Sequence, residues 1–112
     1  MIPTVRCREL EDLVRTADRP VLVACLSGDY NYTPQLNILR ELDATPQHAC
    51  MICQMDVEEL RACANALHIA GTPTFMLFAA GKERGRLLGY ADAERLRVFI
   101  GRVLPAAKAS GR

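Results

Sequence analysis

Two nearly uninterrupted apolar runs constrain the fold of this chain most strongly. The first run covers residues 21–26 (VLVACL) and the second covers residues 49–55 (ACMICQM). Runs of this kind are typical of strands that are covered on both faces, because a strand with one face in water alternates polar and apolar residues. The sequence therefore predicts a sheet that lies between two layers of helices.

Amphipathic helices are predicted on either side of these strands. In residues 6–17, Cys7, Leu10 and Val14 recur at three- and four-residue spacing, with charged residues on the opposite face. Similar patterns predict further helices over residues 34–43, over residues 57–67 and from residue 93 onward. Helices that alternate with strands in this way indicate parallel strands joined by right-handed crossovers.

Specific residues are expected to begin or end these helices. Thr33 is predicted to be the N-cap of the second helix, with Pro34 at its first helical position, where the missing N–H costs nothing. Asp92 is predicted to cap the last helix. His68 is predicted to end the helix before it, with its ring donating to the free carbonyls.

A hairpin is predicted in the second half of the chain. Residues 72–78 are expected to be extended, and residues 79–82 are expected to form a turn in which a glycine adopts a positive φ. The partner strand is expected over residues 85–89. The result is a mixed sheet of four to five strands in one domain of residues 1–106, followed by a flexible tail over residues 107–112.

Charge and composition argue against several functions. The 14 basic residues nearly balance the 13 acidic ones, and the net charge of +1 does not favour nucleic acid or an anionic membrane. No segment has the length of an apolar membrane span, and the N-terminus does not resemble a secretory signal. We therefore expect a cytoplasmic protein whose five cysteines are thiols. The excess of arginine over lysine suggests a bacterial source.

The element order and three sequence blocks resemble thioredoxin over essentially the whole chain. The blocks are residues 20–23 (PVLV), residues 56–57 (DV) after the middle strand, and residues 71–78 (GTPTFMLF), with the hairpin ending at Gly89. The resemblance implies a thioredoxin-like three-layer α/β/α sandwich with a mixed central sheet. It also implies that the Thr72–Pro73 peptide bond is cis.

The residues that carry thioredoxin chemistry are absent at the matching positions. The family's C-x-x-C motif falls on residues 30–33, where this chain has Tyr-Asn-Tyr-Thr, and no cysteine lies between Cys25 and Cys50. Disulfide exchange needs a thiolate of lowered pKa and a second thiol that resolves the mixed disulfide. Tyr30 and Thr33 supply neither group.

Positions that support the chemistry in the family have changed as well. The resemblance places the family's buried aspartate at Ala24, the lysine near it at Gln54, and the tryptophan before the motif at Asp29. We therefore expect a redox-inactive protein without catalytic residues.

The other cysteines are predicted to be structural. Cys50 and Cys53 have C-x-x-C spacing, but in a strand their side chains point to opposite faces and their Cα atoms lie about 10 Å apart, beyond the reach of a disulfide. Cys25 and Cys63 are expected in the core, and Cys7 on a partly exposed helix face. No metal site and no cofactor are expected, because the cysteines and histidines lack the spacing of a four-ligand set.

The candidate site is a partner-binding surface. Tyr30 and Tyr32 lie where thioredoxins meet their substrates, and each either contacts a partner or covers the apolar underside of its loop. The backbone of Thr72 is expected to pair with an extended peptide. The predicted contact residues are Asp29, Tyr30, Asn31, Tyr32, Thr33, Thr72, Pro73, Gly89 and Tyr90.

Three functions follow from this sequence. The first is a redox-inactive module that binds an unknown protein or peptide, as a chaperone or assembly factor. The second is a thiol–disulfide oxidoreductase or thiol-dependent enzyme that uses a displaced cysteine. The third is self-association, in which apolar strand edges pair into a homodimer.

Overall fold

The computed structural model describes residues 2–29, 31–44, 50–55, 61 and 65–104. Several predictions from the sequence lie outside these residues. They concern Tyr30, Cys63, most of the helix over residues 57–67, and the tail over residues 107–112.

The described residues form a mixed sheet with helices before, between and after its strands. Residues 61 and 65–67 are also helical. None of the described helices has both the length and the apolar character needed to cross a membrane. The elements are α1 (Cys7–Thr16), β1 (Val21–Cys25), α2 (Tyr32–Asp43), β2 (Met51–Met55), β3 (Thr74–Ala79), β4 (Lys82–Leu88) and α4 (Ala93–Val103).

The four strands are ordered β2-β1-β3-β4. β1 pairs in parallel with β2 and antiparallel with β3, and β3 pairs antiparallel with β4. A single parallel bridge from Thr4 to Gln54 adds the N-terminal segment beside β2. The predicted mixed sheet is therefore confirmed, with the N-terminal segment as a rudiment of a fifth strand.

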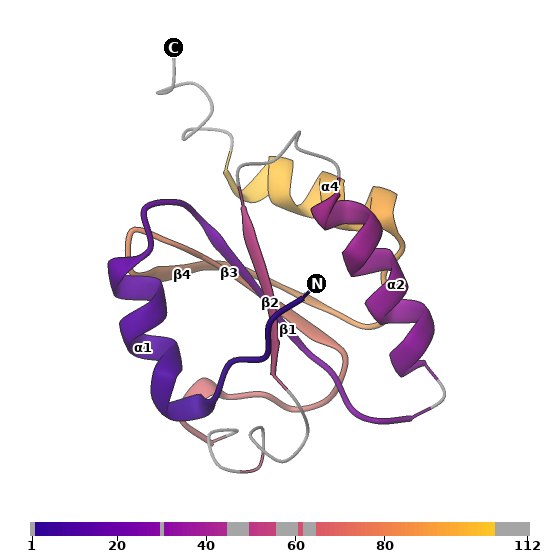
Figure 1. The fold of residues 1–112 in the computed structure, drawn as a ribbon, viewed down its shortest axis with the longest axis horizontal. Coiled ribbons are helices and arrows are strands. Elements are labelled where there is room, and N and C mark those ends of the chain that lie inside the picture. Colours follow the sequence, from indigo (N-terminus) through magenta and orange to yellow (C-terminus); the bar gives the residue numbers. More distant parts are fainter. Residues whose placement is uncertain (1, 30, 45–49, 56–60, 62–64, 105–112) are drawn as a thin grey trace.

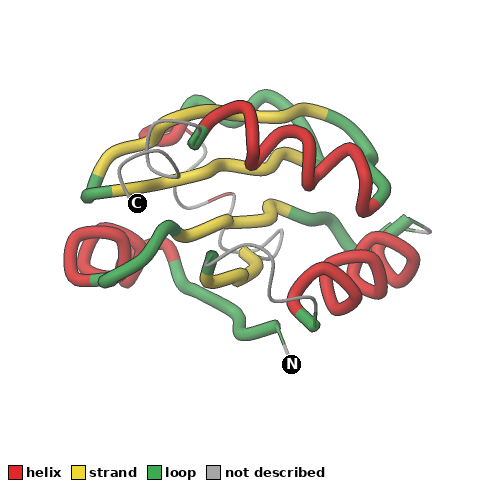
Figure 2. The backbone as a smooth tube through the Cα atoms, turned by 90° about the horizontal axis from the view of Figure 1, so that it is seen from above, coloured by secondary structure: helices red, strands yellow, loops and turns green. Residues whose placement is uncertain are grey.

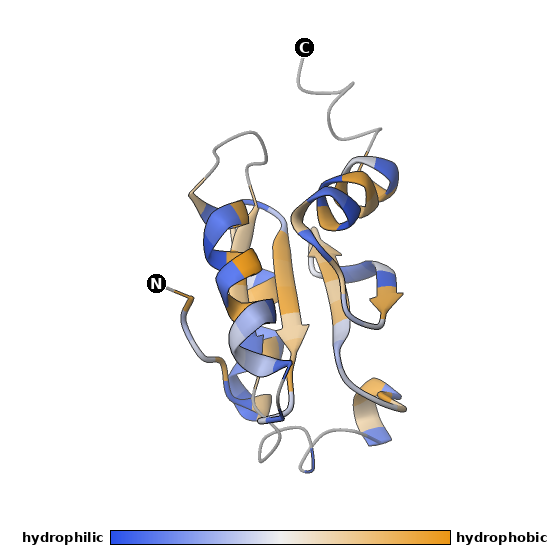
Figure 3. Ribbon diagram, turned by 90° about the vertical axis from the view of Figure 1, so that its right-hand side faces the viewer, coloured by the Kyte–Doolittle hydropathy of each residue, from blue (hydrophilic) through white to orange (hydrophobic). Residues whose placement is uncertain are grey.

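Helices cover both faces of the sheet, so the architecture has three layers (Figures 1 and 2). One apolar cluster joins strand residues such as Leu22 and Phe75 to Leu39 of α2 and Leu96 of α4. A second cluster joins the opposite face of the same strands to α1 and includes Val14. Figure 3 shows strands that are largely apolar between helices that contain both polar and apolar residues. The apolar runs form strands because both of their faces are buried.

The hairpin between β3 and β4 turns on two residues with positive φ. Ala80 has φ of 54° and Gly81 has φ of 78°, the combination that a two-residue type I′ turn requires. The predicted turn is therefore confirmed, but β4 begins at Lys82, three residues before the predicted partner strand. β4 is the outer strand of the sheet, and its charged residues Lys82 and Arg84 are exposed.

The start of α2 differs from the prediction. The helix begins at Tyr32, with Asn31 as the N-cap residue, so Thr33 and Pro34 lie within its first turn. Asp29 moves the start earlier, because its side chain accepts a hydrogen bond from the Asn31 N–H and its carbonyl accepts one from the Tyr32 N–H. A proline is tolerated there because N–H groups of the first turn have no helical partner.

The start of α4 agrees with the prediction. The Asp92 side chain accepts a hydrogen bond of 2.8 Å from the Arg95 backbone N–H. This is the contact by which an N-cap side chain satisfies a free N–H group in the first turn of a helix.

Gly85 in β4 lies against α4, and a substitution at this position tests how closely the helix packs on the sheet. A Cβ atom at Gly85 would lie 2.7 Å from a methyl group of Val103. We predict that Gly85→Ala lowers the free energy of unfolding by about 1–2 kcal/mol, because the short side chain of Val103 has little room to move. Chemical denaturation measures the change.

Two variants control this prediction. Gly28→Ala should leave stability almost unchanged, because a Cβ there meets nothing within 4 Å. Adding Val103→Ala to Gly85→Ala should remove the clash, so the two changes should cost less together than their separate effects predict. Simple additivity would contradict the close approach of β4 and α4.

Candidate functional site

Three loops converge at one end of the sheet, and they contain the predicted contact residues. The Ser27 and Thr72 hydroxyl groups lie 2.6 Å apart and share a hydrogen bond. The Gly89 N–H donates a hydrogen bond of 2.9 Å to the Pro73 carbonyl. We call residues 27–29, 31–33, 71–74 and 88–91 the three-loop surface. The Thr72–Pro73 peptide bond at its centre is cis.

The first loop is held by the carboxylate of Asp29. One oxygen of this side chain accepts a hydrogen bond from the Asn31 N–H at 2.9 Å, and the other accepts one from the Ser27 hydroxyl at 3.3 Å. Such a turn mimics a backbone turn and is typical of aspartate. Asp29 is therefore exposed but already engaged in shaping the loop.

Tyr32 lies half-buried and points inward from the start of α2. Its hydroxyl donates a hydrogen bond of 3.0 Å to the Gln54 side chain, and its ring packs against the apolar cluster under α2 and α4. Gln54 in turn donates to the Ile2 carbonyl and is the neighbour of Ala24 across β1 and β2. Tyr32 thus covers the underside of its loop, and its contact with a partner stays a prediction. Tyr30 lies outside the described residues.

A buried glutamine connects α2 to the third loop. The Gln35 side chain is fully buried, donates to the Ala91 carbonyl at 2.7 Å and accepts from the Ala91 N–H at 3.1 Å. Both hydrogen-bonding groups of one backbone residue are thus satisfied by one side chain. This pair fixes how far the third loop lies from the start of α2.

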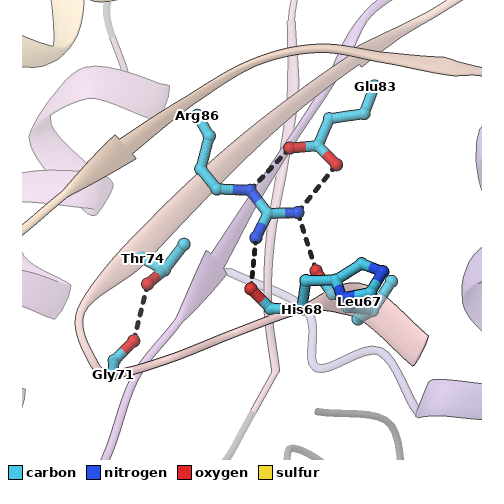
Figure 4. Close-up of polar contacts among 6 residues, drawn as sticks. All are labelled: Leu67, His68, Gly71, Thr74, Glu83 and Arg86. Carbon is cyan, nitrogen blue, oxygen red and sulfur yellow. Dashed lines mark hydrogen bonds and ion pairs between the residues drawn. The ribbon is translucent and has the colours of Figure 1, made fainter. Parts of the chain in front are cut away.

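The second loop is anchored by Arg86 of β4 (Figure 4). The Arg86 guanidinium donates two hydrogen bonds to the Glu83 carboxylate and one each to the carbonyls of Leu67 and His68, all within 2.7–2.9 Å. Hydrogen bonding to Glu83 raises the pKa of Arg86. The Thr74 hydroxyl donates a hydrogen bond to the Gly71 carbonyl and so closes the turn over residues 71–74.

The helical segment before this loop ends beside His68. His68 has a φ of 56°, which places it in the left-handed region that often closes a helix. The carbonyls of Leu67 and His68 receive their hydrogen bonds from Arg86. A planar guanidinium from β4 therefore binds both carbonyls, and the contact of the His68 ring with the helix end stays a prediction.

The exposed part of the three-loop surface combines backbone groups with apolar side chains. Thr72 is exposed, and its backbone N–H and carbonyl make no hydrogen bond to another described residue. Leu88 is 60% exposed and Tyr90 is 43% exposed, on either side of Gly89. A hollow between the first two loops has a volume of about 10 Å³, which holds about one water molecule. The surface therefore suits an extended chain better than a small molecule.

The described cysteines are buried or half-buried, although Cys25 pairs with Thr74 at the edge of the three-loop surface. Cys25 and Cys53 are buried in the cluster between the sheet and α1, whereas Cys50 belongs to the cluster on the opposite face. Cys50 and Cys53 thus face opposite sides, as predicted. Cys7 on α1 is half-buried. Among the described residues, no group of three or more cysteine, histidine or acidic side chains is placed to hold a metal ion.

Burial keeps these thiols protonated. It raises the pKa of Cys25 and of Cys53 from 9.0 to about 12, although the Arg86 cation opposes part of the shift at Cys25. Burial raises the pKa of Cys50 as well. A neutral thiol is a poor nucleophile, so Cys25, Cys50 and Cys53 are poorly suited to attack a disulfide.

Comparison with known proteins identifies the family. The thioredoxin family model matches residues 4–102. The chain belongs to the thioredoxin family. It is 33% identical over 89 residues to thioredoxin Y1, a chloroplast protein of Arabidopsis thaliana, with 77% of this chain and 51% of that protein covered. It is 30% identical over 101 residues to the chloroplast thioredoxin Y of Oryza sativa subsp. japonica, with 88% and 59% covered.

The chain therefore spans only about half of the length of the first of these relatives. Solved structures agree on the fold. A mutant thioredoxin from Halobacterium salinarum NRC-1 superposes with a TM-score of 0.71 at 25% identity, over 90% of this chain and 88% of that one. A designed protein superposes with a TM-score of 0.80 at 18% identity, over 92% and 97% of the two chains, which shows the fold alone.

Sequence reasoning missed three residues that shape the site. Ser27 bonds to Thr72 across the two loops, Gln35 holds the third loop, and Leu88 is the most exposed large apolar residue among the described residues. A polar residue within the apolar face of α2 was a signal for Gln35. Leu88 could not be found, because strand pattern alone does not show that the end of β4 is uncovered.

We predict that Gln35→Leu lowers the free energy of unfolding by about 2–4 kcal/mol. The substitution leaves the N–H and the carbonyl of Ala91 without partners beside a buried helix. Asn37→Leu on the exposed face of the same helix is the matched control and should change stability by less than about 0.5 kcal/mol. Equal effects in chemical denaturation would show that the Ala91 contacts contribute nothing.

We predict that the buried thiols make stability fall as the pH rises. Above about pH 9 the unfolded chain ionises Cys25 and Cys53, whereas the folded chain keeps both protons until about pH 12. The folded state then binds more protons, so each thiol should cost about 3 kcal/mol of stability by pH 11. The double variant Cys25→Ala/Cys53→Ala should lose less stability between pH 8 and pH 11 than the wild type. Parallel denaturation profiles would contradict the raised pKa values.

Proposed function

We propose that this member of the thioredoxin family is redox-inactive and binds extended segments of a partner protein on the three-loop surface. One observation carries the proposal. Thr72 is exposed and its backbone makes no hydrogen bond within the described part of the chain, in a protein that has tyrosine and threonine at the family's two cysteine positions.

The geometry of the three loops supports binding of an extended chain. An extended peptide beside Thr72 gains main-chain hydrogen bonds in the same way that a strand adds to a sheet. Leu88 and Tyr90 offer apolar area on the neighbouring loop. The hydrogen bonds through Ser27, Gln35 and Gly89 hold the loops before the partner arrives, which lowers the ordering cost of binding.

The environment beneath the surface supports the absence of redox chemistry. The buried polar side chains among the described residues are Gln35, Gln54 and Thr74, and all three are neutral. The Gln54 amide accepts a hydrogen bond from the Tyr32 hydroxyl and donates one to the Ile2 carbonyl. Proton transfer to or from a reacting thiol needs an ionisable group within reach, and these residues do not supply one.

Disulfide exchange through a displaced cysteine is the second candidate function. The relatives named above are thioredoxins, which favours this function. Cys7 is the described cysteine nearest to solvent, on the α1 side of the sheet. In this case the wild type would reduce disulfides, and a single Cys→Ser substitution would abolish the activity.

Two measurements test the proposal. In a dithiothreitol-driven insulin reduction assay, the wild type should not exceed the rate without protein. In selection from a displayed library of random decapeptides, the immobilised wild type should enrich binders. The double variant Leu88→Ala/Tyr90→Ala should lower the affinity for these peptides by about tenfold, because it removes the exposed apolar area.

Val98→Ala is the matched control for the binding assay. Val98 is an apolar residue of α4 that is 48% exposed and lies outside the three loops. It should leave the affinity unchanged. The proposal fails if insulin is reduced in a cysteine-dependent way, if no peptide is enriched, or if Val98→Ala weakens binding as much as the loop variant does.

The biological setting is part of the same proposal. A protein that holds extended segments without reacting with them would serve as a chaperone or assembly factor in the cytoplasm of a bacterium. Formation of a homodimer also stays a prediction. Sedimentation velocity at several protein concentrations tests it, because the apparent mass of a self-associating chain rises with concentration.

A further inference from the structure

The guanidinium of Arg95 lies beside the third loop of the three-loop surface. Within residues 27–33, 71–74 and 88–95, the single basic residue is Arg95. Arg95 lies in the first turn of α4, and its guanidinium donates to the Tyr90 carbonyl at 3.3 Å and to the Leu88 carbonyl at 3.5 Å. Both bonds are long, and the residue is exposed. The guanidinium therefore lies against the third loop with most of its donors toward solvent.

The acidic neighbours of Arg95 are engaged elsewhere. The Asp92 carboxylate caps α4 by accepting from the backbone N–H of Arg95. The Glu94 carboxylate pairs with Arg97 at 3.5 Å. Among the described residues, no carboxylate lies within ion-pair distance of the Arg95 guanidinium, in contrast to the guanidinium groups of Arg15, Arg86 and Arg97.

We propose that Arg95 determines specificity on the three-loop surface by binding a carboxylate of the partner segment. The partner would then be an extended chain with an aspartate or glutamate next to an apolar residue. The apolar residue would cover Leu88 and Tyr90, and the carboxylate would receive hydrogen bonds from Arg95. This inference rests on the proposed function and adds the chemistry of the partner.

The described part of the first loop does not supply a free carboxylate that would compete with the partner for Arg95. Asp29 is the charged residue of that loop, and both of its oxygens already accept hydrogen bonds from Asn31 and Ser27. A planar guanidinium matches the geometry of a carboxylate and is less strongly hydrated than an ammonium group. Leu88 and Tyr90 exclude water on one side of the pair, which strengthens an interaction that is weak in full solvent.

The random decapeptide library tests the inference through sequence preference. Peptides selected on the wild type should be enriched in aspartate and glutamate next to apolar residues. Replacing that acid by its amide should lower the affinity of a selected peptide by about three- to tenfold, as measured by fluorescence anisotropy. Added salt should reduce this difference in affinity. Arg95→Gln should bind the acid and amide forms equally well.

A second cation on the same helix provides the control. Arg102 is exposed and lies seven residues after Arg95, about two turns farther along α4. Arg102→Gln makes the same change in net charge and should keep the preference for the acid. A preference that survives in Arg95→Gln, or that disappears equally in Arg102→Gln, overturns the inference.

The outcomes separate this inference from the proposed function. Peptides that bind through Leu88 and Tyr90 without any preference for acids would support the binding function and contradict the role of Arg95. Failure to enrich any peptide would contradict the binding function itself and the role of Arg95 with it. Unfolding curves of Arg95→Gln and Arg102→Gln should match, so a loss of fold cannot imitate a loss of specificity.

Discussion

The complete burial of β1 is the constraint on which the rest of the structure depends. This strand pairs with β2 on one side and β3 on the other, and all of its residues from Val21 to Cys25 are buried. A strand that has neither a free edge nor a free face cannot shift its register without moving apolar residues to the wrong cluster. The loop that follows β1 therefore leaves the sheet at a fixed place, next to Thr72 and Pro73.

Neutral polar side chains build the site on this frame. Ser27, Gln35 and Gln54 make the contacts that join the loops to each other and to the helices. Gln35 bonds to backbone groups alone, whereas Ser27 also donates to the Asp29 carboxylate and Gln54 accepts from the Tyr32 hydroxyl. The buried thiols of Cys25 and Cys53 are held in their protonated form. Hydrogen bonds of this kind hold the three loops in place, which supports the proposed recognition surface.

The fold could be predicted from the sequence where a local pattern determines it. The apolar runs predicted the strands, Asp92 predicted the start of α4, and the glycine at 81 predicted the turn. Prediction failed where distant residues decide the outcome. Thr33 was expected to cap α2, but the turn around Asp29 starts the helix earlier. The carbonyls of Leu67 and His68 are bound by Arg86 of β4, a residue that no local pattern connects to them.

The candidate site was predictable only in part. The resemblance to thioredoxin indicated the three loops, and Thr72, Pro73 and Gly89 do lie together. The inward direction of Tyr32 depends on Gln54, which is 22 positions away in the sequence. The exposure of Leu88 depends on what covers the sheet. The role proposed for Arg95 depends on which groups the neighbouring carboxylates already bind. These are properties of packing in space.

The charged residues of β4 have a consequence for how the sheet meets its own copies. If two β4 strands were aligned antiparallel about Gly85, Arg84 of each would stand opposite Arg86 of the other, and like charges at such short range repel. Charged residues on an outer strand disfavour the edge-to-edge pairing by which sheets join into fibres. Pairing of two β4 strands in this register is therefore disfavoured, although the backbone of the strand is open at the edge of the sheet.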